Sequence, residues 1–346
     1  MVKAIIEKEN FLSNIQDKSA EFLLAGSVTK TSQIEGITQA GIPGLIHLTP
    51  TLDGEFVDSG KLFSLKDIAQ TPKGVPTPAI ITRAVRNLTK FDFGMLDLGL
   101  VVQPRVDNLY QFDIKESESI DKGAGIDAKE LIAKGISFGK SYKCEDDFLI
   151  LGESTPSGTT TARAVAQTLG YDVKDCFSSS FLDAPKSLKD DVIKQAQFLA
   201  DKEKDIYAKL GVVSDNMLLF CAGFVSSFSQ KYKVILAGGT QMAAVMLIID
   251  ALGLSHNVKN IALMTTKWVY EDKHSDIKAL LELLSEPIDA YYADFDFSDA
   301  DIEVLKLYDK GEAKEGVGAG GALCYAYMKG YSKEEITKEV QKVLVG

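Results

Sequence analysis

The sequence has few residues of the kinds that bind metals or form disulfide bonds. It contains three histidines and four cysteines among 346 residues. The cysteines lie far apart, without the spacing of a metal site or a redox motif: Cys144, Cys176, Cys221 and Cys324. The histidines are equally scattered, so no metal and no other cofactor is expected. Because nothing points to disulfide bonds, a reducing cytoplasm is the simplest location.

Long apolar runs and an excess of positive charge are missing too. The longest apolar stretch, residues 242–254, contains Asp250 and is too short to cross a bilayer. The N-terminus lacks the apolar segment of a signal peptide. Lysine and arginine number 38 against 49 acidic residues, a net charge of −11. These features argue against a membrane protein and a general nucleic-acid binder, although they allow a local phosphate site.

Two common phosphate-binding motifs are also absent. Residues 152–160 contain two glycines but lack the lysine of a Walker A motif. No Gly-x-Gly-x-x-Gly pattern follows the first predicted strand, residues 22–26. A nucleotide site in this chain must therefore use other elements.

Strand and helix signals alternate along the chain, and the alternation predicts the fold. Short apolar runs that are typical of buried strands occur at residues 22–26, 95–102, 148–151, 234–237, 261–266 and 288–293. The helical segments between them predict an α/β protein with a doubly wound, mainly parallel, Rossmann-like sheet. Ligands bind at the carboxyl ends of the strands in such sheets, so the turns after Leu151, Leu236 and Met264 are expected to share one crevice.

The terminal parts of the chain give weaker signals. Residues 3–20 are predicted to form a polar helix, and residues 188–210 a single long amphipathic helix. Residues 34–78 contain five prolines and are expected to be irregular, as a functional wall or a subunit contact. We expect a nucleotide-binding α/β core at 74–310. A smaller domain is expected from residues 1–73 together with 311–346.

One stretch combines the features that a phosphate site needs. The apolar run 148–151 leads into residues 152–160, with two glycines, one proline and five hydroxyl side chains, and then into a predicted helix. Glycine lets a ligand approach the backbone, and a helix N-terminus offers free N–H groups with partial positive charge. The candidate phosphate ligands are Ser157, Gly158, Thr159 and Thr160. An ordinary loop with a Ser/Thr helix cap is the alternative.

Two later segments repeat parts of this pattern. Gly238 and Gly239 follow a predicted strand and could either cradle an anion or allow close packing of strand and helix. Glu315 precedes a glycine-rich turn, and burial could raise the pKa of its carboxyl enough for it to act as a general base. A solvated surface glutamate is the default alternative. Lys267, which follows another strand, could supply positive charge or could simply be solvated.

These segments resemble motifs of one enzyme family. Gly152-Glu153-x-x-x-x-Gly158-x-Thr160-Thr161-Ala162 resembles the Gly-Glu-Met-Gly-Ile-Gly-Asn-Thr-Thr-x-Ala motif of the nicotinate-nucleotide–dimethylbenzimidazole phosphoribosyltransferases. Thr159 and Thr160 align equally well with the paired threonines. Residues 314–319 are similar to the family's Leu-Gly-Glu-Gly-Thr/Ser-Gly-Ala motif, whose glutamate is the catalytic base. The serine-rich turn 178–180 and residues 236–244 fall at matching places in the order of motifs.

The N-terminal third resembles a divergent branch of this family, found in archaea and cyanobacteria. Residues 36–41 and 74–84 carry this resemblance. Two departures stand out. Residues 26–29, Gly-Ser-Val-Thr, replace the family's Asp-His-Gly-Val, and the glycine loop lacks the family's asparagine. The resemblance therefore covers the donor half of the site better than the acceptor half.

The resemblance implies transfer of a phosphoribosyl group from nicotinate mononucleotide to a benzimidazole-type base. The product is an α-ribazole 5′-phosphate for the lower ligand of cobamides. Glu315 would be the general base, and Glu153 would orient the ribose or neutralise positive charge. The predicted phosphate and ribose ligands are Ser157, Gly158, Thr159, Thr160, Gly238, Gly239, Lys267, Gly316 and Gly318.

The acceptor base is expected near Thr77, Pro78 and Arg83, and a homodimer is implied. Two other functions stay open. One is a phosphoribosyltransferase that uses another acceptor, such as adenine or a phenol. The other is a nucleotide-binding protein of the same fold without catalytic activity. A purely structural protein fits poorly with three glycine-rich turns between strands and helices.

Overall fold

A computed structural model of the chain describes residues 1–66, 70–173, 175–179, 181 and 186–346. Its centre is an eight-stranded sheet with the order β1-β8-β7-β6-β5-β2-β3-β4. The strands are β1 (Val2–Ile6), β2 (Ala20–Gly26), β3 (Phe93–Asp97), β4 (Leu109–Gln111), β5 (Phe148–Ser154), β6 (Lys233–Ala237), β7 (Ile261–Thr266) and β8 (Asp289–Ala293). β1 pairs antiparallel with β8, and the other neighbours pair in parallel. The predicted mainly parallel α/β sheet is confirmed.

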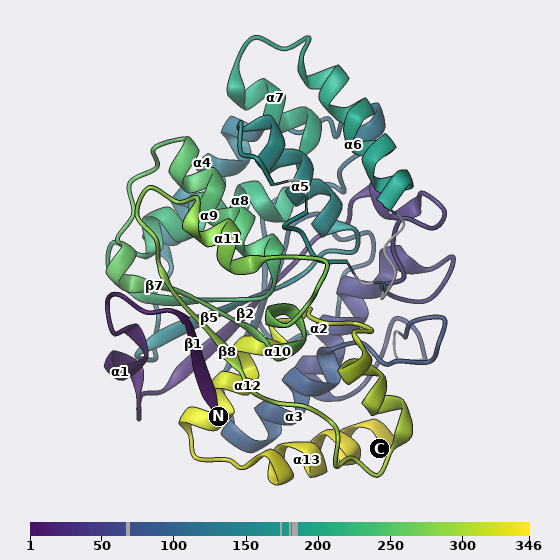
Figure 1. Cartoon of the computed structure of the whole chain (residues 1–346), viewed down its shortest axis with the longest axis vertical. Coiled ribbons are helices and arrows are strands. Elements are labelled where there is room, and N and C mark those ends of the chain that lie inside the picture. Colours follow the sequence, from purple (N-terminus) through teal and green to yellow (C-terminus); the bar gives the residue numbers. More distant parts are fainter. Residues whose placement is uncertain (67–69, 174, 180, 182–185) are drawn as a thin grey trace.

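Helices cover both faces of the sheet (Figure 1). The upper layer in Figure 1 comprises α4 (Ala128–Ser141), α5 (Gly158–Thr168), α6 (Lys186–Ala200), α7 (Ile206–Val213), α8 (Asn216–Phe228), α9 (Thr240–Ala251) and α11 (Ile277–Glu282). The lower layer comprises α2 (Thr49–Ser59), α3 (Ala79–Thr89), α12 (Ala319–Met328) and α13 (Lys333–Val345). Two short α-helices are α1 (Phe11–Ile15) and α10 (Lys267–Tyr270). The described residues also form the 3₁₀ helices η1 (Lys30–Gln33), η2 (Ile46–Leu48), η3 (Ile120–Lys122), η4 (Val258–Asn260) and η5 (Glu303–Lys310).

Strand β5 shows why the buried strands have continuous apolar runs. Leu149 and Leu151 belong to the hydrophobic cluster on one face of the sheet. Phe148 and Ile150 belong to the cluster on the other face. Successive side chains of a strand point to opposite faces, so a strand covered on both sides needs apolar residues at every position.

The order of strands places a topological switch point beside β5. β5 lies between β6 on one side and β2 on the other, and β2 continues the sheet to β3 and β4. The chain therefore leaves the carboxyl ends of β5 and β2 in different directions. In open α/β sheets, ligands bind in the crevice outside such a point.

The N-terminal segment differs from the predicted polar helix at residues 3–20. Val2–Ile6 forms the edge strand β1, and the helix α1 spans only Phe11–Ile15. Pairing with β8 gives Val2–Ile6 backbone partners from a distant part of the chain, and such tertiary pairing overrides local preference.

The segment 34–78 is more regular than predicted, because it contains α2. Pro50 lies in the first turn of this helix, where its missing N–H group costs no hydrogen bond. Leu52 and Phe56 lie four positions apart on α2 and are buried. The prediction of an irregular segment was wrong for α2, because Pro50 in the first turn of this helix was interpreted as a turn signal.

The predicted single helix at residues 188–210 is two helices, α6 and α7. Residues 201–205 between them are all charged and all exposed, because five consecutive charges cannot form an apolar face. Strands β1 and β2, from residues 1–73, pair with strands of residues 74–310. The smaller domain that we propose from the two terminal segments would therefore share the central sheet. No helix among the described residues has the length and apolar character needed to span a bilayer.

Candidate active site

A cavity of about 890 Å³, including its open mouth, lies at the carboxyl ends of β5 and β6. Its walls come from residues within 38–53, 70–78, 153–159, 178–179, 239–241 and 313–317. The turns after β5 and β6 share this crevice, as predicted. The end of β7 reaches it indirectly, because the N–H group of Thr266 donates a hydrogen bond to Glu315.

The turn from β5 into α5 is strained at the cavity wall. Ser157, directly before α5, has φ of 68°, a left-handed conformation that non-glycine residues rarely adopt. The buried hydroxyl groups of Thr155 and Ser157 have no hydrogen-bond partner among the described residues. A Cβ atom at Gly158 would lie 2.2 Å from the side-chain oxygen of Gln241, so a larger residue here would have to displace that side chain. Strain and unpaired buried hydroxyls together are expected where a ligand completes the structure.

Glu153 lies at the end of β5 with a buried side chain. Its carboxyl accepts a hydrogen bond of 3.1 Å from the N–H group of Thr155. Burial, together with the nearby charges of Glu315 and Asp215, raises its pKa to about 8. A Cβ atom at Gly238 would lie 3.8 Å from Cγ of Glu153, so this glycine is next to the Glu153 side chain. Glu153 is therefore mostly protonated at neutral pH and can donate a hydrogen bond.

Glu315 is held by four hydrogen-bond donors. Its Oε1 atom accepts from the N–H groups of Gly316 and Gly320, both at 3.1 Å. Its Oε2 atom accepts from the N–H group of Thr266 at 3.1 Å and from the hydroxyl of Thr265 at 3.4 Å. Burial raises the pKa of Glu315 to about 7 despite these donors. Glu315 lines the cavity, and these four hydrogen bonds fix the position of its carboxyl.

Asp53 is a third carboxyl in the same cavity, and the sequence reasoning missed it. It projects from α2 and is 2% exposed. Its two oxygens accept hydrogen bonds from the hydroxyls of Thr77, at 2.8 Å, and Ser154, at 2.7 Å. Burial raises its pKa to about 6. The signal that could have found it is the spacing of Leu52 and Phe56 after Pro50, which marks α2 as a helix.

A second, cationic cavity adjoins the first. The two share Thr159, Ser178 and Ser179 as well as Lys314. Lys189, from α6, is 8% exposed and donates a hydrogen bond of 3.1 Å to the hydroxyl of Ser179. Burial, together with the charges of Arg163 and Lys314, lowers its pKa to about 8. This ammonium group lies where a negative ligand would restore its ordinary pKa.

Two unpaired polar groups also line the cationic cavity. The Thr160 hydroxyl and Nε of Arg163 are buried there without a hydrogen-bond partner among the described residues. Lys314 has an internal partner, since its Nζ atom lies 2.9 Å from Asp272. The guanidinium of Arg163 is also paired, since its Nη1 atom lies 2.7 Å from Asp190, so the cavity offers an anion the Thr160 hydroxyl, Nε of Arg163 and the Lys189 ammonium group. Sequence reasoning missed Lys189, because a lysine in an amphipathic helix is ordinarily solvated.

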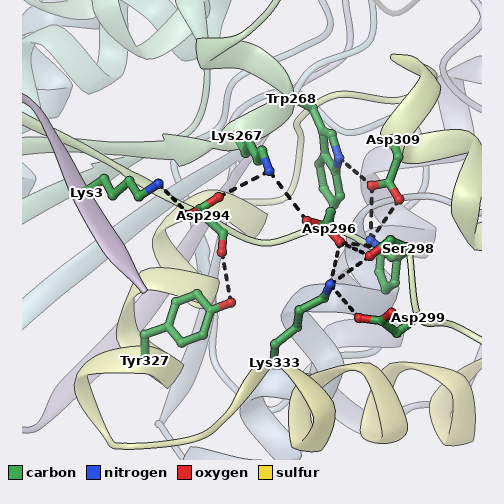
Figure 2. A network of polar contacts seen from close by, with 11 residues as sticks. Lys3, Lys267, Trp268, Asp294, Asp296, Ser298, Asp299, Asp309, Tyr327 and Lys333 are labelled. Atoms are coloured by element: carbon green, nitrogen blue, oxygen red, sulfur yellow. Dashed lines mark hydrogen bonds and ion pairs between the residues drawn. The ribbon is translucent and has the colours of Figure 1, made fainter.

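Lys267 lies in a different environment from the one predicted (Figure 2). Its Nζ atom is 3.2 Å from Asp294 and 3.4 Å from Asp296. Nζ of Lys3, on β1, lies 2.6 Å from the same Asp294 carboxylate, and Nζ of Lys333, on α13, lies 2.5 Å from that of Asp296. This network joins four elements at the edge of the sheet, and Lys267 is part of it. Its placement gives no support to a role in phosphate binding.

Other predicted site residues divide between the cavity and its surroundings. Those that line the cavity are Glu153, Ser157, Gly158, Thr159, Gly239, Glu315, Gly316, Thr77 and Pro78. Arg83 instead caps the end of α2, where it donates to the carbonyl oxygens of Val57 and Asp58 at 3.0 and 2.6 Å. Gly318 packs α12 onto β5, since a Cβ atom there would lie 3.0 Å from Cα of Gly152. Ser178 and Ser179 line the cavity, and Ser180 lies outside the described residues.

Comparison with solved structures identifies the class of fold. A nicotinate-nucleotide–dimethylbenzimidazole phosphoribosyltransferase from Thermus thermophilus superimposes with a TM-score of 0.59 and 13% identity, covering 96% of this chain and 86% of that chain. A structure of CobT from the same organism gives a TM-score of 0.57, with the same identity and coverage. The chain thus has the α/β fold of these proteins, as the motifs predicted.

Sequence comparison then identifies the family. The chain is 40% identical to a UPF0284 protein from Sulfurisphaera tokodaii over 93% of this chain and 92% of the relative. It is 36% identical to a UPF0284 protein from Saccharolobus solfataricus over 99% of this chain and 96% of the relative. The chain belongs to the UPF0284 family. No protein-family model matches it. Both relatives are archaeal proteins, in agreement with the predicted divergent branch.

Proposed function

We propose that this protein transfers the phosphoribosyl group of nicotinate mononucleotide to an aromatic nitrogen base, 5,6-dimethylbenzimidazole or a related compound. The product would be an α-ribazole-type 5′-phosphate, used in the lower ligand of cobamides. The observation that carries the proposal is one cavity in which the buried carboxyls of Asp53 and Glu153 and the half-buried carboxyl of Glu315 lie with a strained helix start, next to a cationic cavity. The likeness in fold to the Thermus thermophilus phosphoribosyltransferase supports it.

The 5′-phosphate is proposed to bind where the two cavities meet. The start of α5 supplies the positive end of the helix dipole, and the hydroxyls of Ser157, Thr159 and Thr160 lie there. Lys189 supplies the positive charge that the sequence reasoning sought in Lys267. A phosphate there would satisfy the unpaired hydroxyls of Ser157 and Thr160 at once.

The chemistry requires a leaving group, a nucleophile and a proton acceptor. The bond from ribose C1 to the pyridinium nitrogen breaks, and its electron pair neutralises the pyridinium to give nicotinate. A ring nitrogen of the base forms the new bond to C1, and the proton from its N–H group passes to a carboxylate. Protonated Glu153 is suited to donate a hydrogen bond to a ribose hydroxyl.

Two carboxylates compete for the role of base. Glu315 is the residue that the motif resemblance implies, and its pKa of about 7 suits the task. Each of its oxygens, however, already accepts two hydrogen bonds. Asp53 has a pKa of about 6, and each of its oxygens accepts one. Because a carboxylate oxygen has two lone pairs, Asp53 retains room for a proton from the acceptor. We therefore favour Asp53 as the general base, with Glu315 as a fixed part of the cavity wall.

A crystal structure with bound nicotinate mononucleotide tests the assignment of the site. The expected phosphate position is within hydrogen-bond distance of Ser157–Thr160 and of the Lys189 ammonium group. A phosphate bound elsewhere on the protein would contradict the proposal. We also propose a homodimer, as the resemblance implies, and light scattering that gives the mass of a monomer would contradict it.

A further inference from the structure

Glu312 is a buried carboxylate that the proposed chemistry does not use. It is 2% exposed and lies three positions before Glu315, in the loop that lines the cavity. Its Oε2 atom accepts a hydrogen bond of 2.6 Å from the side-chain amide of Gln39. Its Oε1 atom forms an ion pair with Nζ of Lys73. Burial of a charged carboxylate costs free energy unless the carboxylate is paired and hydrogen-bonded. The contacts with Gln39 and Lys73 are therefore what allows Glu312 to be buried as a carboxylate.

The two partners of Glu312 come from the two loops that form the acceptor side of the cavity. Gln39 lies between Thr38 and Ala40, which line the cavity. Lys73 lies at the tip of a tight turn, in which the N–H group of Thr71 bonds to the carbonyl of Val75 at 2.8 Å. Both ends of this turn also line the cavity. A single carboxylate therefore holds two separate loops against the loop that carries Glu315.

The turn around Lys73 has a second attachment. The hydroxyl of Tyr308, itself buried, donates a hydrogen bond of 2.6 Å to the carbonyl of Pro76. This bond anchors the base of the turn near Thr77. Lys73, with a side chain 57% exposed, is the attachment of its tip. Loss of the Lys73 contact would free the tip and leave the base of the turn in place.

We propose that Glu312 is a positioning residue that keeps the acceptor wall closed during transfer. The inference rests on the proposed phosphoribosyl transfer. Cleavage of the bond to nicotinate leaves ribose C1 electron-poor, and water can attack it as well as the intended base can. Closed walls exclude water from a reacting centre. Glu312 thereby determines how much of the cleaved nucleotide goes to the base and how much is hydrolysed.

The test compares E312Q, K73M and the double variant with the wild type. Loss of one charge-assisted contact changes an equilibrium constant that depends on this contact by about 10- to 100-fold. We therefore expect the ratio of ribosylated base to ribose 5-phosphate to fall by about tenfold or more in E312Q. The KM for the base should rise, while the affinity for nicotinate mononucleotide stays near the wild-type value. The double variant should be little worse than E312Q, because both changes break one contact.

The matched control is E303Q. Glu303 forms an ion pair with Lys306 and its side chain is 82% exposed, so this variant removes a carboxylate outside the cavity. Its product ratio should equal that of the wild type. An unchanged product ratio in both E312Q and K73M would overturn the inference. If E312Q fails to fold, K73M still tests the inference. Lys73 has a half-exposed side chain, so its replacement is expected to leave the fold intact.

Hydrogen exchange separates this inference from the proposed function. In K73M the amides of residues 70–78 should exchange faster than in the wild type, in E312Q those of residues 36–41 should do so as well, and those of α5 should change in neither variant. Faster exchange in the variants, together with a wild type that transfers nothing, would refute the proposed function and still support the attachment of the two loops by Glu312. Unchanged exchange in both variants would refute the positioning role, whatever reaction the wild type catalyses.

Discussion

The N–H group of Val317 donates a hydrogen bond of 2.8 Å to the backbone carbonyl of Glu153. The carbonyl of Val317 accepts a second bond of 2.8 Å from the hydroxyl of Thr82 on α3. Between these bonds Val317 has φ of 55°, which is unusual for a β-branched residue. The contact joins the end of β5 to the loop of Glu315. Two of the three cavity carboxyls are thus fixed relative to each other by backbone, at a cost in strain of about 1–3 kcal/mol.

The first prediction concerns the base. In D53N the rate of transfer should fall by about 10²- to 10⁴-fold, the usual contribution of a general base. The affinity for nicotinate mononucleotide should change little, because the partners of Asp53, Thr77 and Ser154, are not among the proposed phosphate ligands. Steady-state rates and calorimetric binding of the nucleotide measure the two effects.

E315Q serves as the comparison. Its amide group would turn a donor towards N–H groups that now donate to Glu315, so we expect a lower melting temperature in addition to any loss of rate. In the wild type, kcat/KM should fall below about pH 6, where Asp53 becomes protonated. A normal rate in D53N, with a lost rate and an unchanged melting temperature in E315Q, would return the role of base to Glu315.

The second prediction concerns the phosphate. K189A should weaken binding of nicotinate mononucleotide by about 10- to 100-fold, because a charge-assisted hydrogen bond contributes about 1.5–3 kcal/mol. Binding of nicotinate riboside, which lacks the phosphate, should not change. K194A, an exposed lysine on the same helix, is the control. Equal losses for nucleotide and riboside would show that Lys189 stabilises the fold and does not bind phosphate.

The third prediction concerns stability and pH. The pKa values of Asp53, Glu315 and Glu153 are about 6, 7 and 8 in the folded protein, whereas carboxyls in an unfolded chain titrate near pH 4. Between about pH 5 and 7 the folded state therefore holds more protons than the unfolded state. Its free energy of unfolding should fall as the pH rises through this range, by about 1.4 kcal/mol per pKa unit for a single group.

Urea denaturation at pH 5.5 and 7.5, without ligand, measures this effect. In E153Q the free energy of unfolding should differ less between the two pH values than in the wild type, because the amide does not titrate. Lys189 acts in the opposite direction only above about pH 8, where its lowered pKa lies, so it does not disturb the comparison. A wild type that is equally stable at both pH values would show that the carboxyls are not as buried as described.

The fourth prediction concerns the strain at Ser157. Both S157G and S157A remove the hydroxyl, but only glycine adopts a left-handed conformation without steric cost. S157G should therefore be more stable than S157A by about 1 kcal/mol. Both should bind nicotinate mononucleotide more weakly than the wild type. Equal stability of the two variants would indicate that the turn is not strained in solution.

The parts of the site that the sequence predicted are those built from neighbouring residues. The strand Phe148–Ser154, the turn after it and the start of α5 follow one another along the chain, so apolar runs, glycines and hydroxyls reveal them. The parallel sheet then brings the turns after β5 and β6 to one crevice, because carboxyl ends of parallel strands share an edge. Glu315 was proposed from the glycine-rich turn that follows it and from the motif resemblance, and Glu153 from the resemblance alone.

The parts that the sequence did not reveal depend on contacts between distant residues. Asp53 was missed because Pro50 looked like a turn, whereas it begins α2. Lys189 was missed because a lysine in an amphipathic helix is ordinarily solvated, whereas it is buried and its ammonium group donates to the hydroxyl of Ser179. Lys267 looked free, and its partners Asp294 and Asp296 come from beyond the next strand. No local pattern records such partners.

The most direct test of the proposed function mixes the purified protein with nicotinate mononucleotide, with and without 5,6-dimethylbenzimidazole, and separately with adenine. Nicotinate and the ribosylated base are then measured by mass spectrometry. We expect nicotinate to be released only when an acceptor base is present, in equal amount to the ribosylated base, and to be lost in D53N. Binding of the nucleotide without release of nicotinate, with every acceptor supplied, would contradict phosphoribosyl transfer.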